Sequence, residues 1–315
     1  MSGQIHILGP QRPTPNIANV LNAHCRRGPI AVISAGWRYD ESEIQALTRD
    51  IQREVYHLPL YEWFDELGDK ETELSNEHSE RQKKIKAYKK AYRMRLQLDM
   101  EYLAFIHQLH KSSPVYYEKD LIEARKAIAK TDHDAITRLN EIRLEFPNLQ
   151  EPWLHASAAS YHQEIKDILE KCDVLIITGG HVAILRNRMF FFGLHALLKD
   201  FLEQGKSIIC WSAGAMSLTD EIVLYYDDPP DGKGTAEVLD TGLNLIPNTL
   251  FFPHGRQRLK VDEQLRISSL VHRFTPKRCF ILEEGSHMIY QDQRLTQSTS
   301  TIELFPDGTL AEVQL

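Results

Sequence analysis

The sequence feature that most constrains the fold is a pair of short apolar runs, each followed at once by a turn of small residues. Asp173–Thr178 (DVLIIT) leads into Gly179-Gly180, and Ser207–Trp211 (SIICW) leads into Ser212-Ala213-Gly214-Ala215. A helical segment, Ala183–Gly205, separates the two runs. Uninterrupted apolar runs of this length are typical of strands buried on both faces of a parallel sheet. The segment therefore predicts a strand–helix–strand unit whose two turns meet at the carboxyl edge of the sheet.

The first sixty residues predict the same kind of sheet. Apolar strands are expected at Gln4–Leu8, Pro29–Ala35 and Val55–Leu60, with helices between them at Pro15–His24 and Glu41–Arg53. Alternating strands and helices imply parallel pairing, so we expect an α/β fold, a three-layer αβα domain with a mostly parallel sheet. Shorter strands and hairpins are expected toward the end of the sequence, at Thr249–Phe252, Arg278–Leu282, Met288–Gln291, Thr301–Leu304 and Leu310–Val313.

Residues 69–145 interrupt this pattern. They contain no glycine and are rich in Lys, Arg, Glu, Gln, Ala and Leu, with apolar residues mostly three or four apart. Two long amphipathic helices separated at Ser112-Ser113-Pro114 are expected here, as an insertion within one domain that spans residues 1–315. The insertion could serve as a lid, as an arm joining two copies of the chain, or as a surface for another partner. The alternative is a solvated helical hairpin that only packs on the edge of the domain.

Composition excludes several classes of protein. The 315 residues are 42% hydrophobic and include 37 Lys+Arg against 44 Asp+Glu, a net charge of −7 that disfavours nucleic acid as a partner. No apolar run reaches the roughly 18–20 residues that would cross a membrane, and the N-terminus lacks the features of a signal peptide. The four cysteines are scattered without metal-ligand spacing, so we expect a cytoplasmic protein with free thiols and no metal site.

Ser212 has the setting of a catalytic nucleophile. A tight strand-to-helix turn with small neighbours would raise its hydroxyl from the sheet edge, and the N–H of Ala213 would face a developing oxyanion. The Gly179-Gly180 turn should lie beside it and could supply a second donor from Gly180. A serine in such a turn is also often purely structural, and Cys210 stands where the pattern usually has glycine.

These motifs resemble those of the dipeptidase E/cyanophycinase family of serine peptidases. Ile176–Leu185 (IITGGHVAIL) and Cys210–Met216 (CWSAGAM) match its two hallmark segments, with Thr178, His181 and Cys210 departing from the usual Gly, Asn and Gly. The resemblance extends from about residue 172 to residue 291 and implies a fold like that of class I glutamine amidotransferases. The helical segment 69–145 has no counterpart in the compact dipeptidase.

The resemblance also implies roles for later residues. His254, 42 residues after Ser212, resembles the family's catalytic histidine, and Glu284 resembles the carboxylate that orients it. Asp227 falls where the family carries another acidic residue and ranks below Glu284 for the same task. Glu283 is a weaker candidate because it lacks the match to the family's Glu-Gly. Gly179 and His181 would line the pocket, and Arg256 and Arg258 would suit a substrate carboxylate through a bidentate contact.

The sequence therefore predicts a serine hydrolase of small peptide or amide bonds that uses a Ser212–His254–Glu284 triad and no cofactor. A non-peptide amide is a possible substrate. The alternative is an inactive family member that binds a ligand or a regulatory partner. We also expect that the helical insertion could join copies of the chain into a homo-oligomer.

Overall fold

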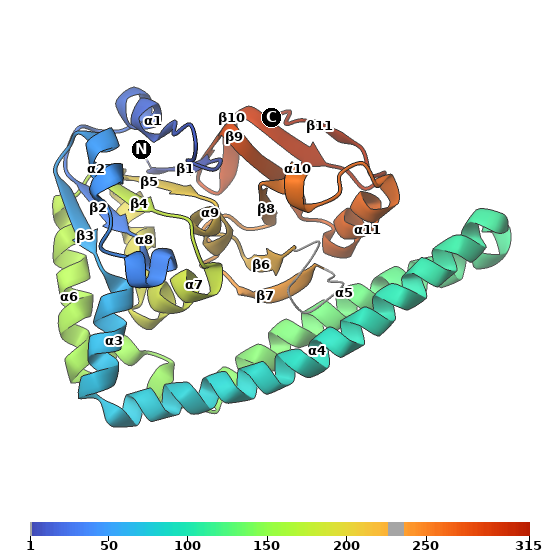
Figure 1. Cartoon of the computed structure of the whole chain (residues 1–315), viewed down its shortest axis with the longest axis horizontal. Coiled ribbons are helices and arrows are strands. Elements are labelled where there is room, and N and C mark those ends of the chain that lie inside the picture. The colour runs from blue at the N-terminus through green and yellow to red at the C-terminus, as the bar shows by residue number, and fades with distance from the viewer. Residues whose placement is uncertain (1, 226–235) are drawn as a thin grey trace.

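The computed structural model describes residues 2–225 and 236–315, and Figure 1 shows an α/β body with a long helical arm. The central sheet runs in the order β11-β10-β9-β1-β5-β4-β2-β3, and β8 also pairs with β9. Pairing is parallel throughout β1-β5-β4-β2-β3, whereas β9, β10 and β11 continue the sheet in antiparallel fashion. The strands of the sheet are β1 Gln4–Leu8, β2 Ile30–Ile33, β3 Val55–Leu58, β4 Val174–Ile177, β5 Ser207–Trp211, β8 Thr249–Pro253, β9 Arg278–Gln291, β10 Arg294–Leu304 and β11 Leu310–Glu312.

Alternate residues of the buried strands serve two separate cores. On β4, Val174 and Ile176 pack in the core beneath α1 (Ile17–His24) and α2 (Gln45–Ile51). Leu175 and Ile177 face the opposite core, which is shared with helices α3, α6, α7 and α8. Those helices span Leu60–Lys70, Ala156–Lys171, Val182–Phe191 and Leu194–Glu203. Because side chains alternate across a strand, this arrangement gives helix, sheet and helix layers, and the predicted fold class is confirmed.

Three details differ from the sequence prediction. The helix expected at Ala183–Gly205 is two helices, because Gly193 adopts φ 70° between them and any side chain there would collide with the indole of Trp153. The second expected helix is shorter than predicted and is confined to α2. Arg278–Leu282 and Met288–Gln291 are parts of one strand, β9, that pairs with β10 along its length.

The predicted insertion is an antiparallel pair of helices, α4 (Thr72–Ser112) and α5 (Pro114–Leu144), which break at Ser113 as expected. We call this pair the arm. It lies between β3 and β4 in the chain and extends beyond the body at one end (Figure 1).

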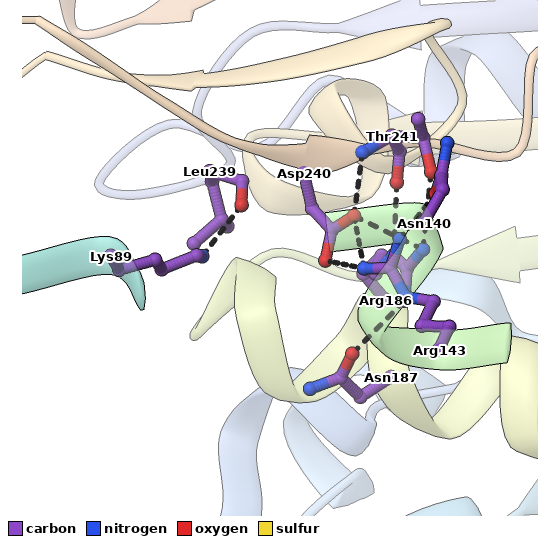
Figure 2. Close-up of polar contacts among 8 residues, drawn as sticks. All are labelled: Lys89, Asn140, Arg143, Arg186, Asn187, Leu239, Asp240 and Thr241. Atoms are coloured by element: carbon purple, nitrogen blue, oxygen red, sulfur yellow. Dashed lines mark hydrogen bonds and ion pairs between the residues drawn. The ribbon is translucent and has the colours of Figure 1, made fainter. Parts of the chain in front are cut away.

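The arm is fixed to the body by buried ion pairs beside the small sheet of β6 (Glu221–Leu224) and β7 (Glu237–Thr241). Figure 2 shows Arg143 of the arm and Arg186 of α7 converging on the carboxylate of Asp240 in β7. Lys89 of α4 donates to the carbonyl of Leu239 over 2.6 Å. Burial alone would raise the pKa of Asp240, but the two guanidinium groups outweigh it and the pKa is lowered.

A second buried network ties the arm to α11 (Gln264–Phe274). Arg273 binds both carboxylate oxygens of Asp132 in α5, with 2.7 Å between Nη2 and Oδ1. The Tyr92 hydroxyl of α4 also donates to Asp132, over 2.7 Å, and accepts from the backbone N–H of Val238 in β7. Four elements therefore meet at one buried ion pair.

Three histidines meet beside β1 and make folding stability sensitive to acid. His6 is fully buried, its Nδ1 lies 3.1 Å from Nε2 of His287, and the ring of His24 packs against both. Burial and the neighbouring histidines lower the pKa of His6 to about 3. Burial, and then the charge of His24, lowers the pKa of His287 to about 4.

We expect the free energy of unfolding to fall as the pH drops below about 6.5. In that range His6 becomes protonated in the unfolded chain but stays neutral in the folded protein. At pH 5 the loss from His6 alone is about 2 kcal/mol. Urea unfolding between pH 5 and 7 measures this slope, which should be shallower in His6→Gln. An unchanged slope in that variant would contradict the assignment.

Candidate active site

Ser212 lies on a sharp turn between β5 and the short helix α9 (Ala213–Ser217). Its backbone adopts φ 49° and ψ −117°, a strained conformation for a residue with a side chain. A Cβ on Gly214 would lie 2.4 Å from the carbonyl oxygen of Ile177, so only glycine lets the turn approach β4 this closely. The chain thus forms a tight strand–turn–helix segment with Ser212 at its bend.

The Gly179-Gly180 turn lies beside Ser212, as the parallel register of β4 and β5 requires. A Cβ on Gly179 would lie 3.1 Å from Cβ of Ser212. Gly180 has φ 114° and packs against Gly36, where any Cβ would lie 2.4 Å from a carbonyl oxygen. Within the described residues, neither the N–H of Gly180 nor that of Ala213 donates a hydrogen bond to the protein.

His254 follows β8 and lines the same cleft as Ser212 and Gly180. Its backbone has φ 56°, and its N–H donates to the carbonyl of Leu282 over 3.0 Å. Partial burial, and then the charge of Arg258, lowers the pKa of the imidazole, while Glu283 opposes this effect. A neutral imidazole can accept a proton. In the part of the chain that the structure describes, the ring and the Ser212 hydroxyl share no hydrogen bond.

The acidic candidates are placed differently from one another. Glu283 lies next to the histidine turn, where its Oε1 accepts a hydrogen bond from the Arg256 N–H over 2.8 Å. Glu284 is solvent-exposed, and Asp227 lies outside the described residues. Strand alternation is the signal that could have singled out Glu283. Ile281 packs against Gly255, and the residue two further along β9 faces the same side.

The cleft has a volume of about 500 Å³. The residues that form one of its walls were not predicted from the sequence. The segments 10–17 and 37–50 supply that wall, including Trp37 and the charged side chains Arg12, Asp40, Glu43 and Asp50. These residues carry no motif of their own. They reach the site because the loops after β1 and β2 end at the same sheet edge as Ser212.

Three predicted pocket residues lie outside this lining. His181 caps α7, with its Nδ1 accepting from the Ile184 N–H over 3.4 Å. Arg256 and Arg258 lie in α10 (Gly255–Arg258), and both are exposed. Arg258 acts on the site through its charge, which lowers the pKa of His254.

The described residues contain neither a metal-binding cluster nor a membrane-spanning helix. No group of three or more His, Cys, Asp or Glu side chains within residues 2–225 and 236–315 is arranged to hold a metal ion. No helix in those ranges combines the length and the hydropathy needed to cross a membrane.

The fold and the site together define an α/β protein with a serine on a strained strand-to-helix turn at the carboxyl edge of its sheet. The family model described as peptidase family S51 matches residues 129–298, and the chain belongs to this family. This is the dipeptidase E family, so the membership predicted from the two motifs is confirmed and the chain is placed among peptidases.

The chain is also similar to two solved structures. One is described as a peptidase from an acI-B1 Actinobacterium, with 12% identity and a TM-score of 0.48 over 100% of this chain and 94% of that chain. The other is described as a putative peptidase E protein from Listeria monocytogenes EGD-e, with 11% identity and a TM-score of 0.48 over 95% of this chain and 100% of that chain. No curated protein sequence matches the chain.

Proposed function

We propose that this protein is a serine peptidase that hydrolyses small peptide or amide bonds, with Ser212 as nucleophile and His254 as general base. The observation that supports this most strongly is the strained turn at Ser212, which lines one cleft with His254 and Gly180. Such strain is maintained at sites where a side chain must be presented to a ligand.

The proposed reaction follows from these positions. The Ser212 hydroxyl attacks the scissile carbonyl carbon while its proton passes to the neutral imidazole of His254. The N–H groups of Gly180 and Ala213 bind the oxyanion of the tetrahedral intermediate. Collapse breaks the C–N bond, and the leaving amine takes the proton from the imidazolium. Water then hydrolyses the acyl-enzyme by the same route and restores the serine.

The sequence predicts Glu284 as the orienting carboxylate, whereas the hydrogen bond from the Arg256 N–H supports Glu283 for this role. The negative charge of Glu283 raises the pKa of His254 and thereby stabilises its protonated form. We expect Glu283→Gln to lower kcat at least about 10²-fold and to move the acid limb of the pH–rate profile to lower pH. Glu284→Gln, the matched control on the exposed side of β9, should stay near wild type. The opposite pattern would assign the role to Glu284.

The substrate class is tested with a panel of dipeptides followed by mass spectrometry. The panel contains Asp-X, β-Asp-X, neutral-X and basic-X peptides, because the family resemblance favours the first two whereas the cleft wall has three carboxylates and one arginine. Each peptide is incubated with wild type and with Ser212→Ala. Turnover by wild type alone supports the proposal and identifies the substrate class, and turnover that survives in Ser212→Ala would refute the proposed nucleophile.

A ligand-binding or regulatory protein is the second candidate. The absence of a Ser212–His254 hydrogen bond among the described residues favours it. Saturable binding of a panel peptide, measured by calorimetry, without cleavage over a day would support this candidate over the peptidase.

A further inference from the structure

The arm exposes an apolar stripe that the body does not use. One face of α4 packs against α5 and the body through Tyr92, Leu96 and Leu103. The opposite face leaves four large apolar side chains in solvent, with exposed fractions of 49–62%. With two exposed alanines they form the outer stripe: Ala87, Ala91, Met94, Leu98, Tyr102 and Phe105.

The spacing of the outer stripe is that of a helix-packing surface. Successive members are three or four residues apart, which places them on one side of the helix over about 27 Å. The four large side chains together expose on the order of 400 Å² per chain, a patch size that in soluble proteins often marks an interaction site.

The stripe does not serve the cleft in this structure. No residue of the arm lines the cleft, and α1 and α2, whose side of the body forms the missed wall, lie across the molecule from the arm (Figure 1). The outer stripe therefore does not act as a lid over Ser212 in this structure.

We propose that the outer stripe is a homodimer interface, in which α4 of a second copy packs antiparallel with the two-fold axis at Leu98. This operation places residue 98−k opposite residue 98+k. Ala91 then lies opposite Phe105, and Met94 lies opposite Tyr102. Each large ring meets a small or flexible partner, so the stripe is complementary to itself.

The edges of the stripe support the same arrangement. Arg95 and Asp99 border one edge of the stripe, and Arg95 donates a hydrogen bond to Asp99 over 3.1 Å. Gln97 and Glu101 border the other edge, and Gln97 donates to Glu101 over 2.9 Å. An antiparallel two-fold axis brings like edges together, with the donor of one copy beside the acceptor of the other. Each of these bonds can thus be exchanged between copies without leaving its donor or its acceptor unpaired.

The charge of α4 disfavours the parallel alternative. Residues 83–95 include seven basic side chains: Lys83, Lys84, Lys86, Lys89, Lys90, Arg93 and Arg95. Parallel packing would set these segments against each other and stack Phe105 on Phe105, whereas antiparallel packing separates them along the helix axis.

The oligomeric state tests the proposal. We expect sedimentation equilibrium of the full chain at micromolar concentration to give twice the monomer mass, and Leu98→Glu to weaken the dimer at least about 100-fold. The matched control is Ile122→Glu, a similar change at a 40% exposed residue of α5 outside the stripe, which should leave the dimer intact. A wild type that is monomeric to about 100 μM overturns the proposal, as does a dimer that survives Leu98→Glu or dissociates equally in both variants.

Cysteine cross-linking tests the direction of packing. Leu98→Cys should form an intermolecular disulfide on mild oxidation, because the two positions meet at the axis. Met94→Cys should not, because two copies of residue 94 would lie about 12 Å apart along the helix, although Met94→Cys with Tyr102→Cys should cross-link. Wild type, whose only cysteine that is not buried is Cys25, gives the background. Cross-linking by Met94→Cys alone would overturn the antiparallel axis.

Discussion

We expect kcat on the best peptide of the panel to fall by at least about 10³-fold in Ser212→Ala and in His254→Ala. The double variant should show a loss of the same size. A serine hydroxyl is a weak nucleophile without a base, and the imidazole has no catalytic proton to transfer without the serine. The two side chains therefore act as a unit, and removing the second costs little once the first is gone.

Steady-state kinetics of the three variants measures this non-additivity. Ser269→Ala is the control and should leave kcat unchanged. Among the described residues, the Ser269 hydroxyl on α11 bonds only to the carbonyl of Leu265. Each variant also needs an unfolding midpoint close to that of wild type, since alanine at Ser212 must adopt the same positive φ. Losses that multiply in the double variant would show that the two residues act independently.

Asp132→Ala is expected to lower the free energy of unfolding by about 3–5 kcal/mol, the largest stability effect predicted for this chain. Asp132 and Arg273 are both more than 90% buried, and the carboxylate binds the guanidinium at two points. Removing it leaves a buried positive charge without its counter-ion and the Tyr92 hydroxyl without its acceptor.

Urea unfolding measures the effect, and the double variant Asp132→Leu with Arg273→Met isolates its cause. If the uncompensated charge is responsible, the apolar pair should recover most of the loss. Glu123→Ala is the surface control, because its pair with Lys126 is largely exposed and should be worth under about 1 kcal/mol. A double variant as unstable as Asp132→Ala would instead assign the loss to packing.

The sheet and the strand-to-helix turn at Ser212 were predictable because their determinants are local. The apolar run Ser207–Trp211 and the glycines near it are enough to predict a buried strand followed by a tight turn, without reference to distant residues. The break at Gly193 was not predictable, because it depends on Trp153, forty residues earlier in the chain.

The cleft was predictable only on the side that carries motifs. Asp40, Glu43 and Asp50 look like ordinary surface acids in the sequence, and only the order of the strands brings their loops to Ser212. The choice between Glu283 and Glu284 likewise depends on which face of β9 meets the turn at His254, and the family motif does not encode that register.

The backbone of Ser212 has a consequence for how this chain tolerates change. A residue with a side chain at φ 49° and ψ −117° costs of order 1–3 kcal/mol that glycine would avoid. Glycine at this position would therefore make the folded chain more stable while removing the only hydroxyl of the turn. A screen for thermostability alone would therefore favour glycine at position 212. Selection for stability and selection for activity thus favour different residues at this position.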